Sequence, residues 1–240
     1  MRLDKFLTMQ GRYTRAQAKA LVRQGRVIVD GVTAADGGMA IDPTQCAVLL
    51  DGEQIAYCDQ LHLMLNKPAG VLTAANDPRH RTVMDLLPPY CAALSCMPIG
   101  RLDLDTQGLL LLTTDGTLAH RLLAPKRGVE KIYEAQLDGR LGPQDVEAFA
   151  AGVALHDFTA RPARLEILPP GDRARVTVCE GKYHQVKRMF QARGRTVLAL
   201  KRLSFGGVAL DASLAPGQWR ELTEQELRTL RGAAEGSANG

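Results

Sequence analysis

The segment Gly100–Gly116 restricts the possible folds of this chain more than any other part of its sequence. It contains four consecutive leucines, Leu109–Leu112, which form an apolar run of strand length, and the turn-forming residues Thr113–Gly116 follow at once. Asp103 lies just before this strand, at the edge of the predicted sheet, where catalytic side chains tend to project. The alternative is that Asp103 only forms a turn or caps a helix, as aspartates in glycine-containing loops commonly do.

Short strands and short helices alternate from residue 63 onward, which predicts an α+β fold for the larger part of the chain. Strands are expected at 63–65, 109–112, 129–137, 175–179 and 196–200, and helices at 143–152, 183–193 and after residue 223. In the strand 129–137, Tyr133 shares one face with Ala135 and Leu137. No apolar run approaches the roughly 18 residues that span a bilayer, and the charged N-terminus is no secretory signal, so a cytoplasmic location is expected.

Positive charge is concentrated at the N-terminus, although the net charge of the chain is only +4. The residues Thr14–Gln17 have the pattern of a helix-capping box, and a strand with an Asp-Gly turn is expected at 26–32. Along one ridge of the predicted helix lie four basic side chains at helical spacing: Arg12, Arg15, Lys19 and Arg23. Such a ridge suits the neutralisation of phosphate groups. A solvated helix face is the alternative.

The segment Glu180–Phe190 predicts a second helix with a cationic stripe. Val186, Met189 and Phe190 recur on its apolar face. The opposite stripe contains His184, Lys187, Arg188 and Gln191. These side chains could hold a phosphodiester backbone, pair with a buried carboxylate, or simply face solvent.

The cysteines indicate neither a disulfide framework nor a metal site. There are five of them, an odd number without a pairing pattern. Cys91 and Cys96 lack the second pair of ligands that a structural zinc site would need. No metal-binding residues are therefore expected.

The motifs, taken in their order, resemble two known families. The segments Met1–Leu7, Thr14–Ala18 and Gly25–Gly31 resemble the S4 RNA-binding domain. The later motifs resemble the pseudouridine synthases of the RsuA branch: Asn66–Gly70, Gly100–Leu110, Lys131–Tyr133 and Glu180–Phe190. The resemblance implies an S4-like domain at 1–60 and a catalytic domain at 61–232, built on a central mixed, largely antiparallel sheet with flanking helices. Residues 233–240 are expected to form a disordered tail.

The resemblance also implies roles for individual residues. Asp103 matches the essential catalytic aspartate of the family, whereas Asp105 in the same turn is expected to be structural. Tyr133 matches the tyrosine that stacks on the target base and is a candidate for handling the proton at C5; from its strand face alone it would be a core residue. Lys187 matches the basic partner of the aspartate, with Arg188 as the alternative.

The remaining expectations concern RNA and substrate. Arg101 is similar to the residue that helps to hold the flipped nucleotide, and His184 and Arg188 are expected to contact RNA, as are Arg15, Lys19 and Arg23. The implied reaction is the isomerisation of a uridine in 16S ribosomal RNA, within the small subunit or an assembly intermediate, by a monomer without cofactor. One alternative is a sister enzyme for 23S ribosomal RNA, and another is a non-catalytic RNA-binding assembly factor.

Overall fold

The computed structural model describes residues 1–9, 13–55, 57 and 60–236. The chain forms two compact units. The first comprises Met1–Leu61 together with Leu87–Cys96, and the second comprises His62–Leu86 together with Met97–Gly240. The return of Leu87–Cys96 to the first unit was not expected from the sequence, and the domain ranges 1–60 and 61–232 stay a prediction.

The first unit contains short helices and a small antiparallel sheet. Its helices are α1 (Leu3–Met9), α2 (Arg15–Arg23) and α3 (Pro89–Ala93), and its strands are β1 (Val27–Val29), β2 (Val32–Thr33), β3 (Val48–Leu50) and β4 (Glu53–Ile55), in the order β2-β1-β3-β4. The capping box of Thr14 and Gln17 is present as predicted. Asp30 and Gly31, with φ of 50° and 80°, form the predicted turn between β1 and β2.

The second unit is built on a nine-stranded mixed sheet. Its main path runs β13-β5-β7-β11-β8-β10-β9, and β6 and β12 pair with β7 and β11. The pairing of β7 with β11 is parallel, whereas the other pairings are antiparallel, so the expected sheet type is confirmed. The strands are β5 (His62–Lys67), β6 (Met97–Pro98), β7 (Gln107–Thr113), β8 (Lys131–Leu137), β9 (Arg164–Leu168), β10 (Arg173–Val178), β11 (Val197–Phe205), β12 (Val208–Ala209) and β13 (Trp219–Glu221).

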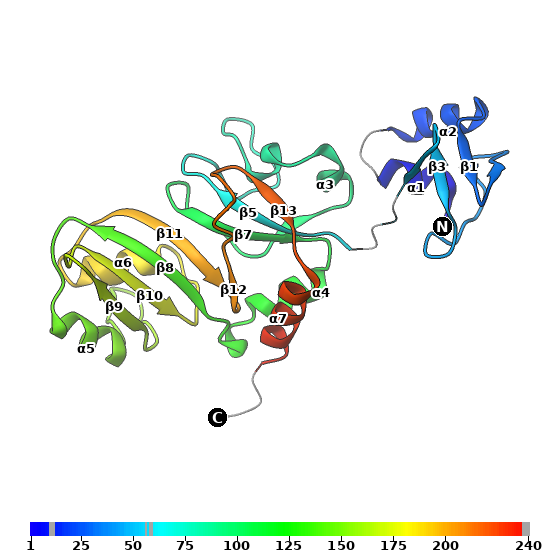
Figure 1. Cartoon of the computed structure of the whole chain (residues 1–240). Helices are drawn as coiled ribbons and strands as arrows, with labels where there is room; N and C mark the ends of the chain where they lie inside the picture. Colours follow the sequence, from blue (N-terminus) through cyan, green and yellow to red (C-terminus); the bar gives the residue numbers. More distant parts are fainter. Residues whose placement is uncertain (10–12, 56, 58–59, 237–240) are drawn as a thin grey trace. The chain divides into compact units, whose positions relative to one another are not determined.

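Helices flank this sheet. Figure 1 shows α4 and α7 beside the part of the sheet that contains β12, and α5 and α6 beside β8, β9 and β10. The helices and helical turns are η1 (Val83–Leu86), α4 (Gly116–Leu123), η2 (Pro125–Arg127), α5 (Pro143–Ala151), α6 (Gln185–Ala192) and α7 (Glu224–Glu235). Aromatic packing joins two of them, because the rings of Phe149 in α5 and Phe190 in α6 lie 5.1 Å apart.

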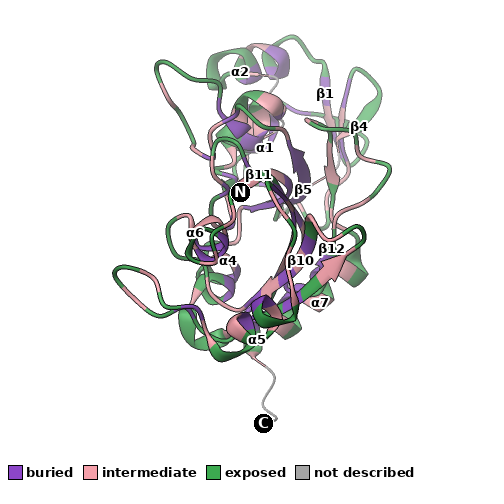
Figure 2. Ribbon diagram, turned by 90° about the vertical axis from the view of Figure 1, so that its left-hand side faces the viewer, coloured by how far each residue is buried: buried purple, intermediate pink, exposed green. Residues whose placement is uncertain are grey.

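The leucine run lies in an interior strand of the sheet, between β5 and β11. Leu109–Leu112 are all 0% exposed, and the neighbouring strand β5 is buried along its whole length, as its purple ribbon in Figure 2 shows. A continuous apolar run, without alternation, is typical of a strand that is covered on both faces. The strand that carries the Asp103 loop is therefore anchored in the most buried part of the unit.

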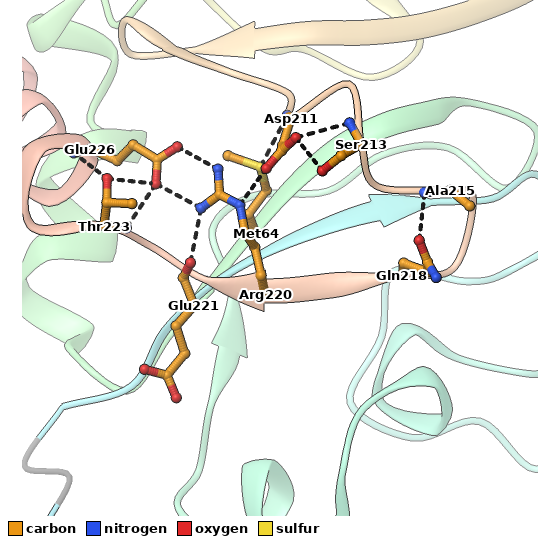
Figure 3. A network of polar contacts seen from close by, with 9 residues as sticks. All are labelled: Met64, Asp211, Ser213, Ala215, Gln218, Arg220, Glu221, Thr223 and Glu226. Carbon is orange, nitrogen blue, oxygen red and sulfur yellow. Dashed lines mark hydrogen bonds and ion pairs between the residues drawn. The ribbon is translucent and has the colours of Figure 1, made fainter.

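A polar network attaches the C-terminal helix to the sheet (Figure 3). Arg220 in β13 donates to Asp211 Oδ2 at 2.7 Å and to both carboxylate oxygens of Glu226 at 2.8 Å. Thr223 and Glu226 form the predicted capping box of α7. The helix continues to Glu235, so the expectation that the tail begins at residue 233 is wrong for residues 233–235; residues 237–240 lie outside the described chain.

Candidate active site

A buried lysine holds the backbone of the loop that carries Asp103. Lys67, the last residue of β5, is 0% exposed, and its Nζ donates to the carbonyl oxygens of Pro68, Asp103, Leu104 and Thr106 at 2.9–3.3 Å. Burial lowers the pKa of this ammonium group to about 8, although the nearby carboxylates act in the opposite direction. The carbonyl groups of this irregular loop have no partner strand, so the ammonium group supplies donors for them.

A threonine holds the residue before the aspartate. The buried Thr73 hydroxyl donates to the Leu102 carbonyl at 2.8 Å and accepts from the Leu102 amide at 3.2 Å. The Gly70 amide donates to the Leu104 carbonyl at 2.8 Å. The backbone on both sides of Asp103 is therefore fixed, which is what a catalytic side chain needs for a constant position.

Gly108 allows β7 and β11 to approach each other directly behind this loop. Its φ is 100°, and a Cβ at this position would lie 2.3 Å from the carbonyl oxygen of Arg202 in β11. Only glycine adopts this backbone conformation without strain and leaves the space open. The Thr-x-Gly sequence after Asp103 thus has a structural reason.

The Asp103 carboxylate meets side chains at the start of α6. Lys187 Nζ lies 3.2 Å from one carboxylate oxygen, and His184 Nε2 lies 3.5 Å from the other. Lys187 also donates to Asp105 at 2.5 Å. His184, directly before α6, has a left-handed backbone with φ of 50°, and such conformations of residues with a Cβ cluster at functional sites.

The two carboxylates beside Lys187 affect its pKa more than its partial burial does. Partial burial lowers the pKa of Lys187, but the hydrogen bond to Asp105 and the charge of Asp103 together raise it above the ordinary value. The same hydrogen bond lowers the pKa of Asp105. Lys187 therefore stays protonated at neutral pH and supplies a fixed positive charge beside Asp103.

Arg188, the alternative partner, points elsewhere. It forms an ion pair with Asp157, and its guanidinium lies 5.3 Å from the centre of the Phe158 ring. Among the described residues, the basic groups paired with Asp103 are Lys187 and His184. Of the two residues that the sequence left open for this contact, the structure therefore selects Lys187.

Tyr133 and Asp103 line one small cavity of about 70 Å³, together with Leu200 and Lys187. Tyr133 is 8% exposed, and it lies on the buried face of β8 with Ala135 and Leu137, as its strand pattern predicts. Tyr133 is therefore both a core residue of β8 and part of the cavity wall beside Asp103. The site unites the loop before β7, the middle of β8 and the start of α6.

The other expected site residues are distributed over two places. Arg101 is exposed and lines the same cavity. His184, which is half-buried, also lines this cavity. Arg15, Lys19 and Arg23 are exposed on α2 in the first unit. Arg12 lies outside the described residues.

Sequence reasoning missed the residues that position the site. Lys67 and Thr73 touch the Asp103 loop only through its backbone, and Gln185 fixes the turn before α6 by accepting from the Lys182 amide at 3.0 Å and donating to Glu180 at 2.7 Å. The available signal was the position of Lys67 in the motif Asn66–Gly70, just after the apolar residues 63–65. Its four acceptors come from chain segments that only the fold brings together.

The arrangement suits chemistry at a carbon atom. Asp103 is 29% exposed at the cavity wall, so its carboxylate can attack an electrophilic carbon or accept a proton. Within the part of the chain that the structure describes, no group of three His, Cys, Asp or Glu side chains could hold a metal ion. No helix among the described residues is long and apolar enough to cross a membrane.

Comparisons with known proteins identify the family of this chain. Residues 61–192 match the family model for RNA pseudouridylate synthase, and residues 1–45 match the S4 domain. The chain is 47% identical to an uncharacterised RNA pseudouridine synthase, YtzG, of Bacillus subtilis (strain 168), over 96% of this chain and 98% of that protein. It is 42% identical to ribosomal small subunit pseudouridine synthase A of Escherichia coli (strain K12), over 96% and 100%.

A solved structure shows the same fold. A crystal structure of a pseudouridylate synthase superposes with a TM-score of 0.68 at 36% identity, covering 96% of this chain and 99% of that one. The expected α+β architecture and the expected enzyme class are thereby confirmed, and the alternative of a non-catalytic assembly factor is set aside. The chain belongs to the RNA pseudouridylate synthase family and carries an S4 domain at its N-terminus.

Proposed function

We propose that this chain isomerises one uridine of 16S ribosomal RNA to pseudouridine, with Asp103 as the reacting carboxylate. The meeting of Asp103, Lys187 and Tyr133 at one cavity carries the chemical part of the proposal. The full-length similarity to synthases named for the small ribosomal subunit favours the 16S RNA over the 23S RNA.

The reaction needs one carboxylate and no external reagent. The N1–C1′ bond of uridine breaks, the uracil turns, and a C5–C1′ bond forms while C5 loses a proton and N1 gains one. Asp103 acts either as the nucleophile at C1′ or as the base at C2′. Because the atoms are conserved and no group changes its oxidation state, the proposal includes no cofactor and no metal.

Tyr133 and Arg101 act on the flipped nucleotide. The target base must leave its stack, and stacking on an aromatic ring such as Tyr133 returns about 1–3 kcal/mol per base. Tyr133 is also the candidate for taking the proton from C5. Arg101, exposed at the rim, holds the backbone or the base of the flipped nucleotide.

The S4 domain anchors the enzyme on folded RNA. Phosphate contacts from Arg15, Lys19 and Arg23 are blind to sequence, so selectivity comes from RNA shape and from the bases around the target. We expect the protein to act as a monomer in the cytoplasm, where ribosomal subunits are assembled.

The test is to map pseudouridine in ribosomal RNA from a strain that lacks the gene, and then to repeat the mapping after adding the purified protein. We expect one site to be absent from the 16S RNA of the strain. The protein should restore it on folded 16S RNA or a partly assembled small subunit, but only poorly on a short oligonucleotide with the target sequence. Modification of 23S RNA with 16S RNA inert would overturn the choice of substrate and leave the chemistry in place.

A further inference from the structure

A second cavity adjoins the catalytic one. It measures about 550 Å³, and its walls are formed by Leu72 and Thr73, by the loop Gly100–Leu104 and by the turn Gly181–His184. The two cavities share Asp103 and its neighbours as a common wall. The proposed function uses the smaller cavity, where Asp103 and Tyr133 meet, and it assigns no occupant to the larger one.

Tyr183 stands at this second cavity with an open ring face. Its ring stacks on the imidazole of His184, with centroids 3.8 Å apart and planes inclined by 17°. Tyr183 is nevertheless 76% exposed, so the ring face away from His184 is open to solvent. Single exposed apolar residues are ordinary, but this ring is already held in place by a neighbour that contacts Asp103.

Two cationic side chains, Arg101 and Lys182, line the cavity around this ring together with the imidazole of His184. The Nζ of Lys182 also lies 3.6 Å from the centre of the Phe158 ring. The amide of Leu72 in the cavity wall donates to the Arg81 carbonyl at 2.9 Å, which joins the wall to a loop with exposed Arg79 and Arg81. An exposed aromatic ring among cations is the combination with which proteins bind single-stranded nucleic acid.

We propose that the second cavity is a subsite for the nucleotide next to the target uridine, and that its base stacks on the open face of Tyr183. The inference rests on the proposed function and adds to it the position of the neighbouring base. When the target uridine flips out, its neighbour loses a stacking partner. Tyr183 replaces that partner, and because every base has a flat face, it does so without selecting a sequence.

His184 acts here as a positioning residue. Its backbone is left-handed, with φ of 50°, and its imidazole lies 3.5 Å from the Asp103 carboxylate while it stacks on the Tyr183 ring. The stacked pair therefore ties the orientation of the neighbouring base to the catalytic carboxylate. This arrangement places two consecutive nucleotides on either side of the Asp103 loop.

The first test compares substitutions of Tyr183 in pseudouridine formation on 16S ribosomal RNA. Because Tyr183 is exposed, these variants should fold normally. Tyr183→Ala and Tyr183→Leu should raise KM about 5- to 150-fold, the equivalent of one lost stacked base, with kcat at saturating RNA changed less than about twofold. Tyr183→Phe should match the parent. Leu198→Ala, which removes another exposed apolar side chain, is the control.

The second test does not depend on turnover. Tyr183→Trp adds a second tryptophan to a chain that contains one, and its fluorescence should be quenched when folded 16S RNA is added, beyond the change seen in the parent and in Leu198→Trp. A KM for Tyr183→Leu equal to that of the parent, or no quenching at residue 183, would overturn the subsite. If the parent forms no pseudouridine, the proposed function fails, and the quenching still decides whether a base stacks there.

Discussion

At the scale of single residues, the position of Asp103 depends on side chains that do not react. Lys67 binds four carbonyl oxygens around the loop, and Thr73 binds both backbone groups of Leu102. Lys187 adds the charge partner from a different element. The loop is thus prepared before RNA arrives, which avoids reorganisation during the reaction.

Asp103→Asn should separate chemistry from binding. The change is nearly isosteric, so the variant should fold and bind RNA as the parent does, whereas pseudouridine formation should fall to background. The measurement is single-turnover formation of pseudouridine at saturating RNA. Residual activity within tenfold of the parent, about 1.4 kcal/mol in the barrier, would contradict the role of Asp103.

Lys67→Met should destabilise the loop that carries Asp103, because it removes the hydrogen bonds to the loop backbone. The thioether has nearly the same length but no donor, so the four carbonyl groups lose this donor, at about 1–3 kcal/mol for a buried group left unsatisfied, as at Thr106. We expect a lower free energy of unfolding in urea and a kcat reduced at least about tenfold in the folded protein, because a displaced carboxylate reacts poorly. Lys126→Met, at an exposed lysine, is the control. An unchanged free energy of unfolding and an unchanged kcat would show that the Asp103 loop keeps its conformation without Lys67.

At the scale of elements, the basic side chains of the two cationic helices, α6 and α2, have different surroundings. In α6 the apolar residues Val186, Met189 and Phe190 are buried as their spacing predicts, and Lys187 on the other side reaches Asp103. In α2 the basic side chains have no such carboxylate target in the site, and they remain exposed. In the proposed function, α6 supplies the charge partner of Asp103, and the exposed basic side chains of α2 bind RNA phosphates.

Replacing Arg15, Lys19 and Arg23 together by Ala should weaken RNA binding. Each lost phosphate contact should flatten the dependence of log Kd on log salt by about 0.7–0.9. The rate at saturating RNA should barely change, because these residues belong to the other unit. The measurement is a binding titration at several salt concentrations, with Arg228→Ala as a control on α7. An unchanged affinity and slope would make the ridge a solvated helix face.

The network around Arg220 should make the attachment of α7 sensitive to acid. Hydrogen bonds from Ser213 and Arg220 lower the pKa of Asp211 to about 2, and those from Arg220 lower the pKa of Glu226 to about 2. A depressed carboxylate pKa stabilises the fold above the unfolded value near about 4 and loses this effect as the pH falls towards about 2. Arg220→Met should therefore lower the free energy of unfolding at pH 7, with a difference from the parent that shrinks towards pH 2.

Urea unfolding at several pH values measures this difference. Arg228→Met is the control, because Arg228 is exposed on α7 and its side chain donates a hydrogen bond to Gln225 of the same helix. A difference between Arg220→Met and the parent that is the same at pH 7 and pH 2 would mean that packing, and not the two carboxylates, attaches the helix.

At the scale of the whole molecule, the reaction should need nothing except protein and RNA. We expect full activity in excess EDTA on RNA that was folded beforehand and is kept folded by a polyamine. The measurement is the yield of pseudouridine with and without the chelator. Loss of activity that one divalent ion restores, while the fold of the RNA stays constant, would contradict a reaction without metal.

The sequence by itself determined the local structure and the family of this protein. Capping boxes, the Asp-Gly turn and the leucine run predict their elements, because caps, turns and continuous burial depend on neighbouring residues. The motif around Asp103 identified the catalytic candidate. The end of α7 was missed, because Gly232 disfavours a helix and the residues from it onward are small and polar as a group. In the structure the helix continues through Ala233 and Ala234, and Ala234 is buried against the core of the second unit.

Only the tertiary structure decided how the site is held together. Lys67, the Asp103 loop and Lys187 come from β5, the segment before β7 and α6, and their contacts exist because the sheet brings these elements side by side. The choice of Lys187 over Arg188 likewise follows from the direction in which each side chain leaves the helix. Spacing along the chain predicts which residues share a face, but the partners across elements depend on packing between segments that are far apart in the sequence.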